Sequence, residues 1–423
     1  MNLFFYNFVF SLFLPFIAGR IFFKSLRDSD YRKHFSNRLG IYNNKDNLKE
    51  VVWFHAVSLG EVISSQKIVK KILKENNVIL SVTTPTGLRE ANKIFGEDVK
   101  VVYAPWDFQW FVSNFFRTYE PKSLILFETE IWPNIISVAS NRKIPIILSN
   151  GRMSESSFQR YKKFNFFSKQ IFRKITHAFV QSAAHKKRFI MLGIDSYKIS
   201  NVGSVKFDIE INTHPEINKD DNKIILAAST HKHEDELIIN AYMKLIEEFK
   251  EIKLIIVPRH PDRSESISNL LDEYKLASSI YDYVPNEFTK NEVTVIKATG
   301  LLNKLYSQST IAFVGGSLFK EYGGHNIIEP ASQGCPFIIG PFMKNFYDIV
   351  EEFSNYDACI QIQDEKELLN AFKALLNSDK LRHDMSERAA EVCLKNQGSL
   401  NEQCNTILKI IRGDKIEISN SNN

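Results

Sequence analysis

The chain contains 423 residues, of which 44% are apolar and 24% are charged, and this length and composition fit a globular protein with two domains. Its formal net charge of +5 suits an anionic substrate or a membrane surface and is too weak to indicate nucleic-acid binding. None of the four cysteines belongs to a C-x-x-C pair, so we interpret them as reduced, mostly buried thiols of a cytosolic protein: Cys335, Cys359, Cys393 and Cys404.

Residues 3–19 are nearly all apolar (LFFYNFVFSLFLPFIAG), slightly fewer than the roughly 20 that a spanning helix needs. No basic region precedes them, so we do not expect a cleaved signal peptide. Because basic residues follow, the positive-inside rule leaves the rest of the chain in the cytoplasm: Arg20, Lys24, Arg27, Arg32, Lys33 and Arg38. We expect residues 1–24 to attach the protein to a membrane, as a spanning helix or an interfacial one; a helix packed on the fold is the alternative.

Short apolar runs then alternate with helical patterns, which indicates βαβ units and a parallel sheet. Helices are expected, for example, at 87–95 and 154–174. The strands expected in the first half lie at 51–57, 78–83, 99–103, 123–127, 144–149, 177–181 and 198–202.

The alternation pauses at the polar residues 208–222, which we interpret as a linker. It resumes with strands expected at 224–228, 254–257, 293–297, 311–314 and 336–339, and helices dominate from 364 to about 412. The predicted organisation is therefore an anchor (1–24), a Rossmann-like domain (25–207), the linker (208–222), a second Rossmann-like domain (223–412) and a disordered tail (413–423).

The stretch Trp53-Phe-His-Ala-Val-Ser-Leu-Gly-Glu61 runs from a buried strand into a helix that begins at Glu61 and extends to about residue 74. Parallel sheets build their sites at such turns, so Glu61 is a candidate catalytic carboxylate. Ser58-x-x-Glu61 is also a capping box, in which both side chains satisfy free amides of the first helical turn. Both interpretations of Glu61 stay open at this point.

Three further strand ends of the first half carry charged side chains. Glu128-Thr129-Glu130 either offers carboxylates to a site or places Glu130 in the first turn of the next helix. Arg152 suits an anionic substrate, since a guanidinium matches carboxylate and phosphate. Lys206 either stabilises negative charge or is a solvated linker lysine.

In the second half, Ser229, Thr230 and His231 follow a strand, and we expect their amides and hydroxyls to meet a phosphate. A metal-ligand interpretation of the H-x-H-E spacing at 231–234 lacks a fixed third partner. Arg259 follows the next strand and is a candidate phosphate partner.

The glycine pairs at 315–316 and 323–324 let backbone amides approach a phosphate. A helix starting near Asn326 would direct its N-terminus there. Glu329, one turn into that helix, could accept hydrogen bonds from ribose hydroxyls.

Other motifs are excluded. No Walker A motif, G-x-S-x-G or G-x-G-x-x-G follows a strand, which argues against a P-loop NTPase, an α/β-hydrolase and a typical NAD enzyme. Asp28-Ser29-Asp30 has the form of a GT-A metal motif, but it lies in the basic segment and we interpret it as solvated.

Nine ordered motifs, reaching from the N-terminal anchor to near residue 411, together resemble one family: the 3-deoxy-D-manno-octulosonic acid (Kdo) transferases of lipopolysaccharide synthesis. They are HAVSLGE (55–61), TTPTG (83–87), ETEIWPN (128–134), NGRMS (150–154), GSVKFD (203–208), STH (229–231), VPRHPDR (257–263), FVGGS (313–317) and GGHNIIEPA (323–331).

The resemblance implies a GT-B fold, in which two Rossmann-like open parallel-sheet domains face a central cleft. It also implies a CMP-Kdo donor, a lipid A precursor (lipid IVA) as acceptor, no metal or cofactor, and attachment to the inner membrane with the catalytic domains on its cytoplasmic side. The catalytic base falls on Glu61, and the groups that act in the transition state fall on Glu128 and Lys206. CMP contacts fall on Pro258, Arg259, Thr299, Gly300, Leu301, Asn326, Ile327, Ile328 and Glu329.

One stretch departs from the family pattern: Lys297-Ala-Thr-Gly300-Leu301-Leu302 replaces Asp-Thr-x-Gly-Glu-Leu, so the acidic side chain is absent at Leu301. Two rival interpretations are another GT-B enzyme, such as a nucleotide-sugar epimerase, and a non-catalytic, membrane-tethered nucleotide-binding protein. The apolar N-terminal run argues against the first, and the presence of Glu61, Glu128 and Lys206 argues against the second.

Overall fold

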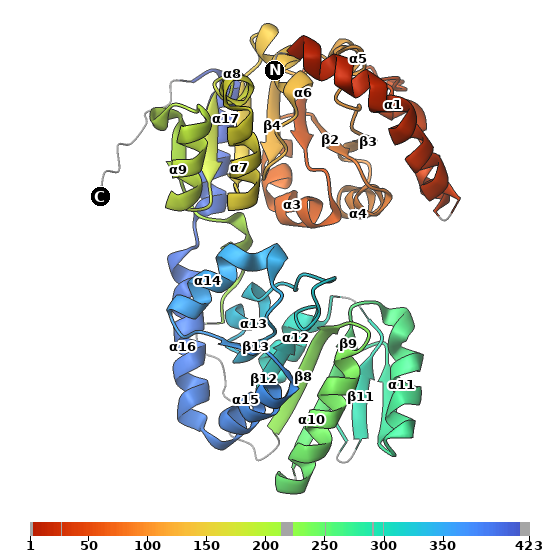
Figure 1. Ribbon diagram of the computed structural model, residues 1–423, viewed down its shortest axis with the longest axis vertical. Helices are drawn as coiled ribbons and strands as arrows, with labels where there is room; N and C mark the ends of the chain where they lie inside the picture. Colours follow the sequence, from red (N-terminus) through yellow and green to blue (C-terminus); the bar gives the residue numbers. More distant parts are fainter. Residues whose placement is uncertain are drawn as a thin grey trace. The chain divides into compact units, whose positions relative to one another are not determined.

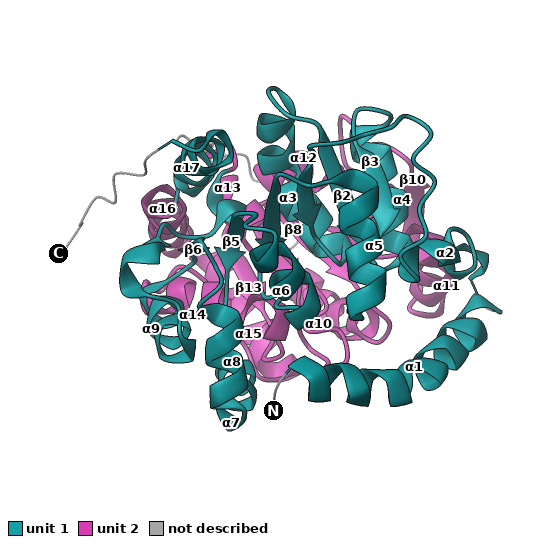
Figure 2. Ribbon diagram, turned by 90° about the horizontal axis from the view of Figure 1, so that it is seen from above, with its two compact units in different colours: residues 1–208, 397–423 teal, residues 209–396 magenta. Residues whose placement is uncertain are grey.

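The computed structural model describes residues 3–26, 28–212, 223–249, 251–289, 292–298 and 300–414. The chain divides into two compact units, residues 1–208 with 397–423 and residues 209–396 (Figure 2). Within the described residues, each unit is built on a parallel sheet of seven strands (Figure 1). The alternating apolar runs had predicted two parallel α/β domains, and the structure confirms this fold class.

The first sheet has the order β3-β2-β1-β4-β5-β6-β7, which follows the Rossmann pattern. Its inner strand β1 pairs with β2 through Val52 and Val78 and with β4 through Val52 and Ser123. The strands are β1 (Val52–His55), β2 (Val78–Val82), β3 (Lys100–Tyr103), β4 (Ser123–Phe127), β5 (Ile146–Gly151), β6 (His177–Val180) and β7 (Ile199–Asn201).

Helices cover both faces of this sheet, because its strands are apolar on both sides. One face packs against α5 (Gln109–Tyr119), α6 (Pro133–Asn141), α7 (Glu155–Lys163), α8 (Asn165–Phe172) and α9 (Ala183–Leu192). The other packs against α3 (Leu59–Leu73), α4 (Pro85–Phe95) and α17 (Ser399–Arg412). The single helix expected at 154–174 is two helices that meet at Phe164.

The second sheet has the order β10-β11-β9-β8-β12-β13-β14. Its strands are β8 (Lys223–Thr230), β9 (Ile252–Pro258), β10 (Ala277–Tyr281), β11 (Glu292–Ile296), β12 (Ile311–Val314), β13 (Phe337–Ile339) and β14 (Ile360–Gln361). Its helices are α10 (Glu234–Glu248), α11 (Ser264–Glu273), α12 (Leu302–Gln308), α13 (Ile328–Ser332), α14 (Tyr347–Asn355), α15 (Glu365–Asn377) and α16 (Asp379–Lys395). The two edge strands β10 and β14 were missed, because they are short or only half-buried and have no apolar run.

The last helix departs from the predicted domain boundary. The run of helical patterns predicted a second domain that extends to residue 412, whereas the structure groups residues from 397 onward with the first unit. The cause is packing: Cys404, Ile407 and Ile410 of α17 join the core that lies beneath α3. Most of the predicted linker and the predicted disordered tail, at 213–222 and 415–423, lie outside the described residues.

The N-terminal helix α1 (Leu3–Ser25) is, among the described helices, the one that is long and apolar enough to cross a membrane. It lies against the rest of the first unit (Figure 1): the Phe10 ring stacks on Phe108 at the start of α5, with the ring centroids 6.2 Å apart. Its other side leaves large apolar side chains exposed: Phe4, Phe5, Phe8, Leu12, Phe13, Phe16, Phe22 and Phe23.

Candidate active site

Glu61 lies in the first turn of α3, which follows the inner strand β1. Ser58 is the N-cap, so α3 begins at Leu59, two residues earlier than predicted. The Glu61 carboxylate accepts hydrogen bonds from the Val57 N–H at 2.9 Å and from the Ser58 hydroxyl at 2.8 Å. The capping arrangement predicted from the sequence is therefore present, although the amide that the carboxylate binds is that of Val57.

The environment of Glu61 changes its acidity. Burial, together with the nearby carboxylates of Glu130 and Glu128, raises its pKa from an ordinary value of 4.5 to about 8. The hydrogen bonds from Val57 and Ser58 act in the opposite direction and are outweighed. A carboxyl group with this pKa exchanges its proton near neutral pH, as a general acid or base requires.

Glu128 follows β4 in a left-handed backbone conformation, with φ of 58°. Its N–H donates to the Ser149 carbonyl on β5, 3.0 Å away, which fixes the turn. Its carboxylate oxygens lie 3.1 Å from Lys206 Nζ and 3.4 Å from Arg152 Nε. The structure thus brings together Glu128, Arg152 and Lys206, three side chains predicted from separate strand ends.

Glu130 lies in the turn before α6 and not in the first turn of that helix. The Trp132 indole N–H donates to its carboxylate at 2.7 Å. Burial raises the pKa of Glu130, and the Glu128 charge adds to the rise. Glu130 affects the pKa of Glu61 more than Glu128 does, so it belongs to this site although the family-derived assignment omitted it.

Gln403 of α17 was missed by the sequence analysis and is fully buried beneath the site. Its Oε1 accepts from the Ser149 hydroxyl at 2.7 Å and from the Asn150 N–H at 3.1 Å. Asn150 Oδ1 in turn accepts from the N–H of Val205, the neighbour of Lys206, at 3.2 Å. The last helix therefore ties together the turns that carry Arg152 and Lys206.

In the second unit, the predicted residues follow three adjacent strands. Ser229, Thr230 and His231 lie at the end of β8, Pro258 and Arg259 at the end of β9, and the glycine-rich stretch follows β12. The carboxyl ends of neighbouring parallel strands share one edge of a sheet, where open α/β sheets bind ligands.

Two histidines meet at this edge. His231 Nε2 lies 2.9 Å from His325 Nε2, and the Tyr322 ring stacks on His231 with the centroids 3.9 Å apart. Burial and neighbouring cations lower the pKa of His231 to about 4 and that of His325 to about 3, so both rings are neutral at pH 7. Gly316 leaves room for the pair, because a Cβ there would lie 2.8 Å from the His325 ring.

The first glycine pair has a different role from the one predicted. The fully buried Glu234 carboxylate accepts hydrogen bonds from the N–H groups of Gly316, Ser317 and Leu318 at 2.7–3.0 Å. It also accepts from the His231 N–H at 2.9 Å. The expectation that these amides meet a phosphate is wrong, since Glu234 already binds them. The preceding H-x-H pattern gave no indication of this role.

The second glycine pair leads to a short helix. α13 begins at Ile328, two residues later than predicted, and the Asn326 side chain accepts from the Ile328 N–H at 3.1 Å. The Asn326 amide also donates to Glu329 Oε1 at 3.0 Å. Burial raises the pKa of Glu329, and the Asn326 hydrogen bond and the charge of Arg259 oppose that rise. Ile327 and Ile328 are buried.

The remaining predicted contacts lie after β11. Gly300 adopts φ of +82°, a left-handed conformation that favours glycine, and Leu301 is the N-cap residue of α12. Thr299 lies outside the described residues.

Comparison with solved structures identifies the class of fold. A UDP-N-acetylglucosamine 2-epimerase is 14% identical, with a TM-score of 0.57 over 89% of this chain and 100% of that one. A glycosyltransferase from Rickettsia africae is 16% identical, with a TM-score of 0.55 over 88% of this chain and 100% of that one. At such low sequence identity, these similarities show the fold alone. They agree with two Rossmann-like units of the GT-B class.

Sequence comparison identifies the family. Residues 33–209 match the model described as 3-deoxy-D-manno-octulosonic-acid transferase (kdotransferase), and residues 208–392 match glycosyl transferases group 1. The 3-deoxy-D-manno-octulosonic acid transferase of Haemophilus influenzae is 32% identical over 94% of this chain and 96% of that relative. A bifunctional glycosyltransferase/methyltransferase of Fusobacterium nucleatum is 35% identical over 82% of this chain, which spans 57% of that relative. The chain belongs to the 3-deoxy-D-manno-octulosonic acid transferase family.

Proposed function

We propose that the protein transfers Kdo from CMP-Kdo to a sugar hydroxyl of a lipid A precursor, lipid IVA, with Glu61 as the general base. Family membership supports the reaction class and the transferred sugar. The observation that carries the role of Glu61 is its position at the carboxyl end of the inner strand β1, combined with a pKa raised to about 8.

In the proposed reaction, the acceptor oxygen forms a bond to the anomeric carbon of Kdo while the bond from that carbon to the CMP phosphate oxygen breaks. The ionised Glu61 carboxylate takes the proton from the acceptor hydroxyl. Its low solvent exposure keeps water from competing for this position.

Lys206 and Arg152 supply positive charge near this base. Both are held by Glu128, at 3.1 and 3.4 Å, so their head groups are fixed before substrate binds. We assign them to the carboxylate of Kdo and to the negative charge that develops on the leaving group. Glu128 then orients two cations and also raises the pKa of Glu61.

Donor binding is assigned to the strand ends of the second unit. Arg259 offers a guanidinium to the CMP phosphate, and Glu329 offers carboxylate oxygens to the ribose hydroxyls. CMP leaves with a single phosphate, whose charge these side chains can meet, so we propose that transfer needs no metal and persists in EDTA. Ser229 and His231 are assigned further contacts to CMP-Kdo. The side chain of Thr230 is fully buried.

The apolar helix α1 is assigned to membrane attachment, with the catalytic units on the cytoplasmic side of the inner membrane. Its exposed phenylalanines and the basic residues after it fit the boundary between acyl chains and anionic head groups.

The substitution Glu61→Gln separates catalysis from capping. Glutamine keeps the capping pattern but cannot take a proton, so transfer should fall roughly 10²–10⁴-fold while CMP-Kdo binding persists. The folded-state pKa of about 8 exceeds the ordinary 4.5, so the parent loses stability as the pH rises from about 4.5 to about 8. The variant lacks this loss and should be at least as stable at neutral pH, as measured by thermal unfolding.

The matched control is Glu155→Gln, the same chemical change in the first turn of α7, where the side chain is exposed. It should leave transfer unchanged. Near-normal turnover by Glu61→Gln would remove Glu61 from the chemistry and leave it a cap alone.

A further inference from the structure

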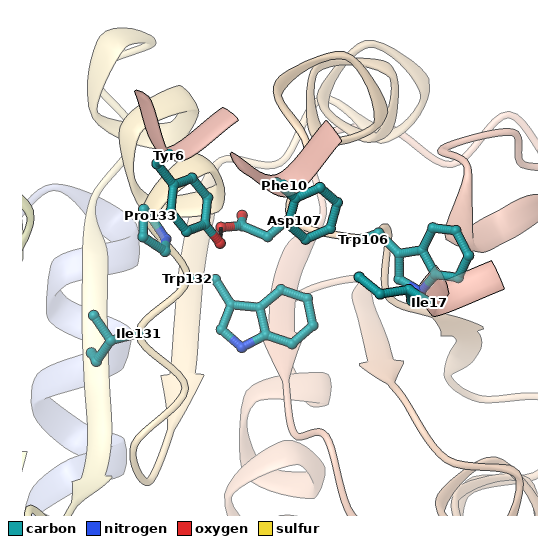
Figure 3. Close-up of a pocket in the computed structure, with 8 residues that line it drawn as sticks. All are labelled: Tyr6, Phe10, Ile17, Trp106, Asp107, Ile131, Trp132 and Pro133. Carbon is teal, nitrogen blue, oxygen red and sulfur yellow. Dashed lines mark hydrogen bonds between the residues drawn. The ribbon is translucent and has the colours of Figure 1, made fainter. Parts of the chain in front are cut away.

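A cavity of about 240 Å³ lies between the N-terminal helix and the rest of the first unit. Tyr6, Phe10 and Ile17 of α1 line one side of it, and Trp106, Ile131 and Trp132 line the other (Figure 3). The last three come from the connections that follow β3 and β4, so the cavity opens at the same edge of the sheet as Glu61.

The polar groups at one end of the cavity are already paired. The Asp107 carboxylate accepts from the Tyr6 hydroxyl at 2.9 Å and from the N–H groups of Asn134 and Ile135 at 3.1 and 3.0 Å. Asn7 of α1 and Asn134 exchange hydrogen bonds at 3.0 and 3.2 Å. These contacts fix α1 on the unit and leave mainly aromatic and aliphatic surface for an occupant, and such a cavity selects an apolar ligand.

The cavity is connected to the candidate active site through Trp132. One side of this residue lines the cavity, and its indole N–H donates to Glu130 at 2.7 Å. Its ring also packs edge-on against His55 of β1, with the centroids 4.8 Å apart. Glu130 is the carboxylate that most raises the pKa of Glu61, so an apolar group in the cavity is two side chains away from the proposed base.

The cavity is also bounded by the helix that is assigned to the membrane. Its wall is α1, whose outer side exposes Phe8, Leu12 and Phe16. Arg20 lies three residues after Ile17, on the same side of the helix, and is exposed, so a cation stands near the aliphatic end of the cavity. Apolar walls flanked by a cation match a phosphorylated lipid with its chain inserted and its head group outside.

We propose that this cavity binds one acyl chain of the acceptor lipid and thereby holds the acceptor's sugar at Glu61. The proposal rests on the proposed function and names a second part of the same acceptor site. It commits to the acceptor's own chain, because the cavity adjoins the proposed catalytic carboxylates as well as the exposed surface of α1.

The test fills the cavity and compares two acceptors. Ile17→Phe enlarges a half-buried side chain that lines it, and Leu12→Phe makes the same kind of enlargement on the exposed side of the helix. The full chain in detergent micelles is assayed with the acylated lipid A precursor and with its fully deacylated disaccharide. Ile17→Phe should lower kcat/KM for the acylated acceptor roughly tenfold and leave that for the disaccharide unchanged. Leu12→Phe should change neither.

Equal loss on both acceptors, or no loss on either, would overturn the proposal. So would a parent enzyme that uses the disaccharide as well as the acylated acceptor. If a bulk membrane lipid occupied the cavity, Ile17→Phe should lower kcat/KM equally for both acceptors. The comparison of the two acceptors therefore also distinguishes a chain of the acceptor from a chain of a membrane lipid.

A binding measurement separates this proposal from the proposed function, because it needs no turnover. A dibrominated fatty acid should quench the fluorescence of Trp106 and Trp132 in a Trp110→Phe background, which removes a highly exposed tryptophan. Adding Ile17→Phe should relieve the quenching, and adding Leu12→Phe should not. Quenching that is the same in both variants would show that the chain does not occupy the cavity. Absence of Kdo transfer with normal quenching would refute the proposed function and leave chain binding standing.

Discussion

Glu61 combines two properties that the sequence analysis treated as alternatives. It completes the N-terminal cap of α3, and it is a buried carboxyl group whose pKa is raised by burial and by two neighbouring carboxylates. A helix N-terminus lowers the pKa of a carboxyl group by itself, so the outcome depends on which effect is larger. The position of Glu61 was predictable from the strand-to-helix turn in the sequence. The direction of its pKa shift was not, because Glu130 and Glu128 approach it from another strand.

The raised pKa predicts how the rate depends on pH. If Glu61 acts as the ionised base, kcat/KM should rise about tenfold per pH unit below the pKa of about 8 and level off above it. The measurement is a pH profile of Kdo transfer by the parent and by Glu61→Gln, whose residual activity should lack this rise. A parent profile that is flat from pH 6 to about pH 9 would contradict the assignment.

At the scale of elements, the central strands were predictable because each is a short apolar run between helical patterns. The predicted strands at 123–127 and 311–314 coincide with β4 and β12. The edge strand β10 was not predictable, since it has two serines in its middle and is half-exposed. Nor was the return of α17 to the first unit, because an amphipathic helix does not specify which of two cores it packs against.

Some residues of the candidate site were also predictable from local sequence patterns, and others were not. Glu61, Glu128, Arg152 and Lys206 follow strands, and local patterns were enough to find them. Gln403 acts from 253 and 254 positions away in sequence, so no local pattern identifies it. The glycine pair at 315–316 was misinterpreted because its backbone does approach an anion, but that anion is the Glu234 side chain of the same unit.

Gln403 supports the turns that carry Arg152 and Lys206. Gln403→Leu leaves the Ser149 hydroxyl and the Asn150 N–H without their acceptor, so unfolding free energy should fall by roughly 1–3 kcal/mol and kcat should also fall. Gln403→Glu keeps an acceptor oxygen for both donors and should recover part of the activity. The measurements are thermal unfolding and kcat at a temperature where both variants are folded. Full activity in folded Gln403→Leu would show that α17 stabilises the fold without affecting the site.

At the scale of the whole molecule, α1 has two different sides. Tyr6, Asn7 and Phe10 fix it to the first unit, while the opposite side exposes a row of phenylalanines. The sequence of this helix is compatible with a spanning helix, an interfacial helix and a helix packed on the fold. A helix docked by one side and apolar on the other fits the interfacial placement, with its exposed side in the lipid.

This arrangement predicts that membrane binding can be weakened without unfolding the protein. Replacing Phe4, Phe8 and Phe16 by serine removes exposed aromatic side chains and leaves the docking contacts intact. Sedimentation with vesicles that contain anionic lipid should show reduced binding, and the residual binding should fall further at high salt because it depends on basic residues. Unchanged sedimentation, or a parent protein that stays soluble without detergent, would contradict this role for α1.

The most direct test of the central claim is mass spectrometry of the acceptor after incubation with the purified full-length protein and CMP-Kdo. The proposed function predicts that the lipid A precursor gains the mass of Kdo, and that the gain is strongly reduced when Glu61→Gln replaces the parent protein in the same reaction. An acceptor whose mass is unchanged by the folded, CMP-Kdo-binding parent would contradict Kdo transfer. A full mass gain with Glu61→Gln would contradict the assignment of the base.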